Sequence, residues 1–121
     1  MTPGRYVDGI RLETARRLLE DKGRQAASHW LTLDQLPGLG AAPSPDRVVF
    51  DGKYATAAGV SSGIDLALHL AGRIAGDRVA QAIQLGTEYD PQPPYSAGSP
   101  ATAPAEVVAA LRADKARIMG A

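Results

Sequence analysis

The sequence contains no cysteine among its 121 residues, and it has only one tryptophan, one phenylalanine and two histidines. Without cysteine the chain can form no disulfide, no thiolate metal site and no thiol nucleophile. The two histidines, His29 and His69, stand forty residues apart, which is not the spacing of a metal-ligand motif. We therefore expect no metal site and no cofactor.

An excess of charge and a long apolar run are also absent. Thirteen basic and thirteen acidic side chains give a net charge of zero, which removes the usual electrostatic attraction to nucleic acid. No apolar stretch approaches the roughly 20 residues that span a bilayer, and Met1 precedes a polar segment instead of a signal-peptide core. With 45% hydrophobic residues, we expect one cytoplasmic domain with a modest core and no membrane partner.

Helical spacing and turn residues divide the first third of the chain. Apolar residues recur at helical spacing over residues 7–19, and Gly23 is suited to end that amphipathic helix. A short extended piece at Ala26 and Ala27 and a small helix over 31–36 are expected next. Pro37-Gly38 ends the small helix.

The middle of the chain carries the strongest β signal. Asp51-Gly52 tolerates the positive φ angles of a tight turn and separates residues 47–50 from 53–56, so we predict a β-hairpin. Apolar helices are predicted over 64–75 and 79–88, the second capped by Asp77. A Pro-rich stretch through residue 103 is expected to wrap over the core, and one last helix is expected over 104–118.

Several strings in this part of the chain resemble one family. They are "GRQAASHW" and the run from "PDRVVFDGKYATAAGVSSG" through "EYDPQPPYSAGSP". These strings resemble the C-terminal half of ThiJ/PfpI-superfamily domains, specifically the isonitrile hydratase-like branch and the amidase-like domains of some AraC-type regulators. The resemblance covers residues 23–121. It implies an α/β sandwich with a largely parallel sheet, usually dimeric, in which a histidine approaches a cysteine on a sharp strand-to-helix elbow.

The resemblance singles out His29 as the candidate catalytic residue. Its string "AASHW" matches the family's histidine position, whereas the nucleophile position, counted back without gaps, falls on Gly9. The upstream strands that would supply an acidic partner and most of the sheet have no counterpart in the sequence. Attack by a thiol requires a thiolate, side chains that activate it, and hydrogen-bond donors for the charge that develops. The chain has one such activating side chain, His29, but no thiol nucleophile. A histidine beside Trp30 also fits a side chain that packs and hydrogen-bonds in the interior.

Residues 1–22 resemble a different class of protein. The string "TPGRYVDGIRLETARRLLED" is similar to the connecting helix of AraC/XylS-type DNA-binding domains. Neither complete helix-turn-helix is present, so recognition of specific bases does not follow. We therefore divide the chain into an AraC-like helix, 1–22, and a ThiJ/PfpI-like unit, 23–121, and interpret it as rearranged, recombined or engineered. Acidic residues alternate with the basic cluster, which indicates a solvated face; the cluster is Arg11, Arg16, Arg17, Lys22 and Arg24.

A rival motif occurs at residues 59–63, which fit the G-x-S-x-G pattern of a serine nucleophile elbow. Ser61, Asp65 and His69 follow at steps of four, which would align them on one helix face. The carboxylate would then lie between the other two groups, and Ser61 and His69 would be roughly 12 Å apart at 1.5 Å per residue. We expect instead a tight turn, a serine-capped helix and a surface pair of Asp65 with His69.

The helix predicted over 64–75 is apolar around most of its circumference, which is typical of a buried helix. A hairpin and one further strand are too few to cover it, so an isolated monomer would expose apolar surface and strand edges. The predicted fold class is a truncated ThiJ/PfpI-like α/β sandwich, rich in helix and with little parallel sheet. We expect self-association, as a homodimer or higher homo-oligomer, to complete it.

Three functions are compatible with the sequence. The first is a non-catalytic structural or self-association module, a half-domain that lacks its nucleophile. The second is an isonitrile hydratase-like hydro-lyase or hydrolase whose site is rebuilt across a dimer from His29, with Ser61 or Asp65 as substitutes. The third is a fragment of an AraC-type transcriptional regulator, for which salt-dependent binding to duplex DNA would be the sign.

Overall fold

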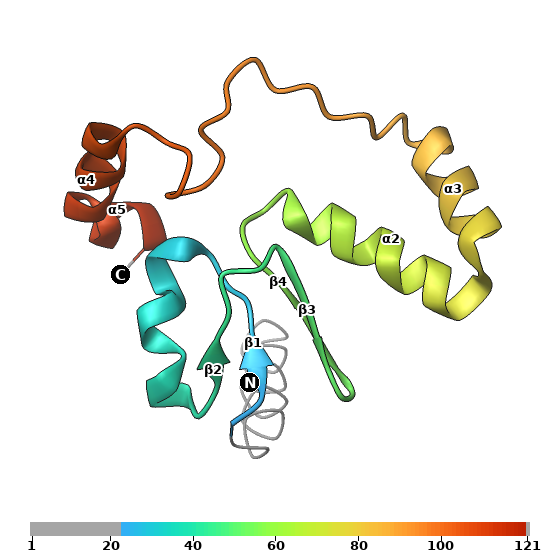
Figure 1. The fold of residues 1–121 in the computed structure, drawn as a ribbon, viewed down its shortest axis with the longest axis horizontal. Coiled ribbons are helices and arrows are strands. Elements are labelled where there is room, and N and C mark those ends of the chain that lie inside the picture. The colour runs from blue at the N-terminus through green and yellow to red at the C-terminus, as the bar shows by residue number, and fades with distance from the viewer. Residues whose placement is uncertain (1–22, 121) are drawn as a thin grey trace, which may run out of the picture.

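The computed structural model describes residues 23–120, which form short strands with helices on two sides. Figure 1 shows the strands near the centre, α2 and α3 on one side, and α4 and α5 on the other. The elements, with η for 3-10 helices, are β1 (Gln25–Ala26), η1 (Trp30–Gln35), η2 (Pro37–Leu39), β2 (Ala42–Pro43), β3 (Val48–Asp51), β4 (Tyr54–Ala57), α2 (Ser62–Ala75), α3 (Asp77–Gly86), α4 (Ala105–Ala113) and α5 (Lys115–Met119).

Two small sheets form the strand layer. β3 and β4 pair antiparallel with Val48 opposite Ala57, which confirms the predicted hairpin with a shift of one residue. β1 and β2 pair in parallel, and β2 was not predicted because two residues ending in proline carry no strand signal. The Gln25 N–H donates to the Asp51 carboxylate at 2.7 Å, which fastens β1 to the end of the hairpin.

Gly52 closes the hairpin in the left-handed region, at a φ of +60°. We predict that Gly52→Ala lowers the free energy of unfolding by about 1 kcal/mol, because an L-residue is strained at this φ. A Cβ there would also lie 2.9 Å from the Arg24 guanidinium, whose flexible side chain can move. Gly52→Asn should cost less, since asparagine tolerates this conformation. Equal urea midpoints for Gly52→Ala and the unchanged chain would contradict this account.

The helices begin and end near their predicted bounds, with three differences. The predicted small helix over 31–36 is the 3-10 helix η1, which begins one residue earlier. Asp77 was predicted to cap its helix but is the first residue of α3, which follows Gly76 and has no side-chain cap. The single helix predicted over 104–118 is wrong, because Asp114 leaves helical geometry and separates α4 from α5.

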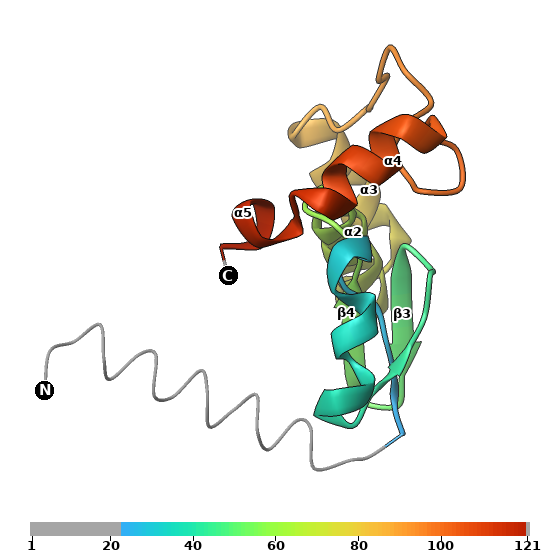
Figure 2. The ribbon, with the colours of Figure 1, turned by 90° about the vertical axis from the view of Figure 1, so that its left-hand side faces the viewer.

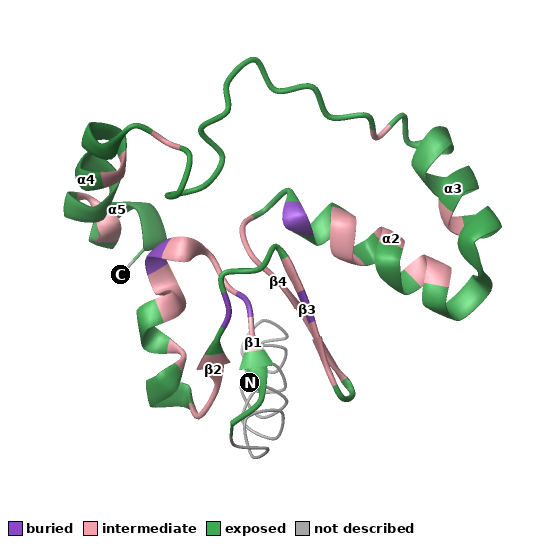
Figure 3. Cartoon of the chain, in the orientation of Figure 1, coloured by how far each residue is buried: buried purple, intermediate pink, exposed green. Residues whose placement is uncertain are grey.

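The core of the described residues is small, as the few purple segments in Figure 3 show. The buried residues are Ala27, Leu31, Ser44, Val49 and Ser62. Only Ser62 of α2 is buried and Ile74 is 83% exposed, so the single chain exposes its apolar helix, as expected for an isolated monomer. The apolar character of α2 is therefore not matched by a cover within residues 23–120.

The Pro-rich segment 91–102 is exposed at every residue and arches between α3 and α4 (Figure 1), so the predicted wrap over the core is wrong. Beyond the arch, the Lys115 ammonium lies 3.0 Å from the Asp34 carboxylate of η1. The Arg112 guanidinium lies 5.7 Å from the centre of the Trp30 ring. These contacts connect the C-terminal helices to η1, and Figure 2 shows α5 projecting beside the end of α4.

Candidate functional site

His29 is held by the backbone of the turn that it precedes. Its Nδ1 accepts a hydrogen bond from the Leu31 N–H at 3.2 Å, and its carbonyl accepts from the Thr32 hydroxyl at 2.9 Å. An acceptor Nδ1 places the proton of the neutral imidazole on Nε2. The ring is half-buried, and the hydrogen bond to the Leu31 N–H sets its orientation.

The loop that leads into α2 lies against the His29 ring. A Cβ built on Gly59 would be 3.7 Å from His29 Cδ2, so this loop passes at van der Waals distance from the imidazole. The Ser62 hydroxyl donates to the Gly59 carbonyl at 2.6 Å, and Ser62 is fully buried. Ser62 thus fixes the loop that faces His29. Within residues 23–120, no carboxylate is hydrogen-bonded to this imidazole.

The close approach of Gly59 gives a graded test of this packing. We predict that Gly59→Ala leaves the His29 ring in place, because the added Cβ makes an ordinary contact. Gly59→Val adds two methyl groups and should displace the ring. The measurement is the NMR shift of the His29 Cδ2 proton, with His69 as an internal control. Equal shifts of the His29 proton in both variants would contradict the predicted contact.

A second polar cluster joins the hairpin, α2 and the residues after α3. The Arg47 guanidinium donates through Nε to the Asp65 carboxylate and through Nη2 to the Ser61 hydroxyl, the latter at 3.1 Å. The Tyr89 hydroxyl donates to the other oxygen of Asp65 at 2.6 Å. Asp65 therefore has a donor on each oxygen, and these charge-assisted hydrogen bonds connect three separate segments of the chain.

These contacts shift the pKa values of the cluster. Partial burial pushes the pKa of Asp65 upward, but the hydrogen bonds from Tyr89 and Arg47 outweigh it and hold this pKa below its ordinary value. The hydrogen bond to Asp65 is the largest cause of the raised pKa of Tyr89. The stable state of the cluster at neutral pH is an ionised carboxylate with a protonated phenol.

The lowered pKa of Asp65 predicts a pH-dependent contribution to stability. The stabilisation is fully present above the unfolded pKa, about 3.8, and is lost as the pH falls through the lower folded value. Asp65→Asn should therefore be less stable than the unchanged chain at pH 7, and the difference should shrink below about pH 4. Urea unfolding across this range measures it, with Asp90→Asn as the exposed control. A difference that is constant with pH would contradict the role of the charge.

The alternative serine triad does not form. Ser61 accepts from Arg47, and Asp65 is bound to Arg47 and Tyr89, so neither hydrogen-bonds to His69. His69 instead packs edge-on against Phe50, with ring centres 6.0 Å apart. Asp65 and His69 interact electrostatically, which helps to lower the pKa of Asp65, but the hydrogen bonds to Asp65 come from Arg47 and Tyr89. The expected serine cap is absent too, because Ser61 makes no capping hydrogen bond.

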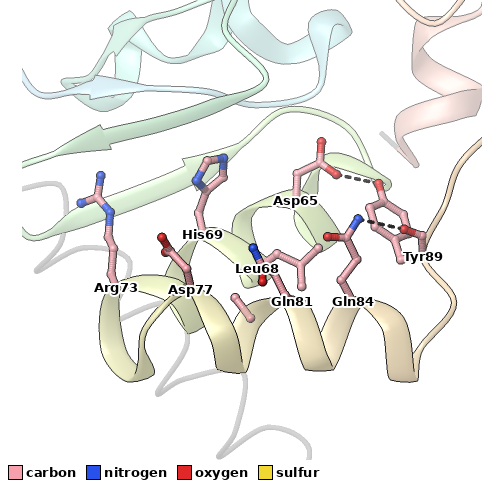
Figure 4. A pocket seen from close by; sticks show the side chains of 10 residues that line it. Asp65, Leu68, His69, Arg73, Asp77, Gln81, Gln84 and Tyr89 are labelled. Carbon is pink, nitrogen blue, oxygen red and sulfur yellow. Dashed lines mark hydrogen bonds between the residues drawn. The ribbon is translucent and has the colours of Figure 1, made fainter.

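A polar groove of about 530 Å³ lies between α2 and α3 (Figure 4). Arg73 lies 3.5 Å over the Phe50 ring at one end, and Tyr89 closes the other. The Gln84 side chain donates to the Tyr89 carbonyl at 3.1 Å. Among residues 23–120, no group of three or more histidine or acidic side chains could hold a metal ion. Acidic and basic side chains both line the groove, but they do not converge on one point where a reaction could take place.

The sequence did not predict that Arg47 and Tyr89 are connected through Asp65. An arginine before a strand and a tyrosine after a helix have no shared periodicity, so nothing in the sequence links them. Gly9, the AraC-like segment and most of the basic cluster lie outside the described residues. Arg24 of that cluster is described, and its guanidinium lies 3.0 Å from the Asp51 carboxylate. In the part of the chain that the structure describes, no helix is long and apolar enough to cross a membrane.

Comparison with known proteins supports a ThiJ/PfpI-like domain. The chain is 51% identical over 87 residues to an isonitrile hydratase of Pseudomonas putida, covering 72% of this chain and 38% of that protein. A crystal structure of a THiJ/PfpI family protein from Pseudomonas syringae superposes with a TM-score of 0.75 at 44% identity, covering 79% of this chain and 40% of the other. No protein-family model matches. The chain spans about two fifths of the length of these relatives, and its helices and small sheets are compatible with a truncated form of their fold.

Proposed function

We propose that this chain is the histidine-bearing half of an isonitrile hydratase-like domain, and that it acts as a self-associating structural module without thiol catalysis. The observation that carries this proposal is that His29 is held in place but has no thiol partner. The imidazole is oriented by Leu31 and packed beside Gly59, yet the 121 residues contain no cysteine for it to activate. Its position matches the family histidine, and its surroundings support a packing role.

The alternative of a rebuilt enzyme is less well supported by the geometry. Ser61 and Asp65, its substitute groups, are both engaged by Arg47. A serine that accepts a hydrogen bond from a cation, with no base hydrogen-bonded to it, is not activated for attack. The regulator alternative rests on residues 1–22 and would be supported by salt-dependent binding to duplex DNA.

An isonitrile assay tests the proposal. Hydration adds water to the isonitrile carbon and yields an N-substituted formamide, which chromatography detects. We expect no formamide above the uncatalysed background from the unchanged chain, from His29→Ala or from the His69→Ala control. Turnover that is lost in His29→Ala and kept in His69→Ala would refute the non-catalytic proposal and favour a rebuilt site.

A further inference from the structure

The α2–α3 pair has two faces of opposite character. On α2, Asp65, His69 and Arg73 point toward the hairpin, as their contacts with Arg47 and Phe50 show. At 100° per residue, the stripe of Ile64, Ala67, Ala71 and Ile74 lies on the other side of α2. Ile64 is 46% exposed and Ile74 is 83% exposed.

α3 continues this exposed surface. α2 and α3 approach each other at Gly72, where an added Cβ would lie 3.8 Å from the Ala80 side chain. Val79 and Ile83 are each 44% exposed and are rotated away from the groove-lining residues of α3. We call the six residues of both helices the apolar face: Ile64, Ala67, Ala71, Ile74, Val79 and Ile83. It contains no charged side chain.

The α2 stripe has a self-complementary order. The order of its four residues is symmetrical about position 69. Ile64 and Ile74 are equally far from that position, and so are Ala67 and Ala71. An antiparallel pairing of α2 with a second α2 would therefore place isoleucine against isoleucine at both ends and alanine against alanine in the middle. Small central residues permit close approach of the two helices, and a twofold interface requires this kind of self-matching surface.

We infer that the apolar face is the twofold interface between two copies of this chain, with antiparallel α2 helices at its centre. This inference rests on the proposed self-association and identifies its surface. Antiparallel packing places the positive N-terminal end of each α2 beside the negative C-terminal end of the other. The four large side chains of the apolar face are between 44% and 83% exposed in the single chain, which leaves apolar surface for a second copy to cover. A specific interface buries at least roughly 1,000 Å² in total, and the two faces would form its apolar centre.

Cysteine pairing tests the arrangement, because the chain has no cysteine of its own. A mixture of Ala67→Cys copies and Ala71→Cys copies should form disulfide-linked dimers on mild oxidation, since positions 67 and 71 face each other. Either variant alone should cross-link about 10-fold less, because its two cysteines are offset by about 6 Å along the helix axes. Ala109→Cys, at an exposed position of α4, is the control for random collision.

A charge pair provides a second test. Ala67→Glu alone and Ala71→Lys alone should each weaken dimerisation by about 100-fold in light scattering, because each buries an unpaired charge. The double variant places the new carboxylate at position 67 opposite the new ammonium at position 71 of the other copy, and it should recover most of the affinity. Both replacements suit a helix, and circular dichroism of the single variants checks that α2 still forms.

The outcomes separate this inference from the proposed function. A monomer at micromolar concentration would overturn both the interface and the proposed self-association. A dimer that does not cross-link 67 to 71 more than the Ala109→Cys control would overturn the interface alone. Isonitrile turnover would overturn the non-catalytic proposal without affecting the cross-linking result.

Discussion

Replacing Leu31 with alanine lowers the free energy of unfolding by about 3 kcal/mol, one of the two largest losses that we expect from a single change. Leu31 is 4% exposed and is the largest side chain among the buried residues of the described core. Truncating a buried leucine loses its transfer free energy and leaves a cavity, which together cost about 2–5 kcal/mol.

Leu39 offers a matched control for this measurement. It is also a leucine in a 3-10 helix, but it is 53% exposed. Leu39→Ala should change the free energy of unfolding by no more than about 0.5 kcal/mol. Urea unfolding followed by circular dichroism, at one fixed protein concentration, compares the two variants. Equal losses would show that burial in this chain does not determine the cost.

Ser62→Val should lower the free energy of unfolding by about 2–4 kcal/mol, because it combines two costs. Ser62 is fully buried, and its hydroxyl donates to the Gly59 carbonyl. Valine removes that donor and adds volume where no space is open. Ser62→Ala removes only the donor and should cost about 1–2 kcal/mol.

The neighbouring serine is the control for Ser62. Ser61 occupies the central position of the G-x-S-x-G pattern, is exposed and accepts one hydrogen bond from Arg47. Ser61→Ala should change the free energy of unfolding by no more than about 0.5 kcal/mol. If Ser61→Ala is the more damaging change, the turn depends on the Arg47 contact and not on Ser62. The same unfolding experiment, with the NMR signal of His29 as a second readout, decides between them.

The sequence predicted the local features of this fold because their determinants are local. Asp51-Gly52 specifies a tight turn by conformational preference alone, and the hairpin was found. Gly76 and the Pro-rich run marked where α2 and α3 end, and the predicted bounds of both helices differ from the observed ones by at most two residues. The break at Asp114 was missed because alanine, leucine and arginine around it are all good helix formers, so propensity gave no sign of it.

Features that depend on contacts between distant segments were not predicted. Asp65 was assigned to His69, its neighbour one turn along, whereas Tyr89 and Arg47 approach from outside the helix. The arch at 91–102 was expected to cover the core, but composition specifies only that a segment is irregular. His29 was singled out by resemblance to a family, and its catalytic role stays a prediction. Its hydrogen bond to Leu31 and its contact with Gly59 required coordinates.

The arch is the covalent link between α3 and the C-terminal helices. α4 and α5 reach η1 through the Trp30 and Lys115 contacts, and the arch as a linker keeps these partners near each other. Its contribution is therefore an effective concentration, which falls slowly with linker length, and doubling the segment costs only about 0.6 kcal/mol. A chain cleaved within the arch keeps both sets of contacting residues. Whether its two fragments separate on dilution reports the strength of the helix docking itself.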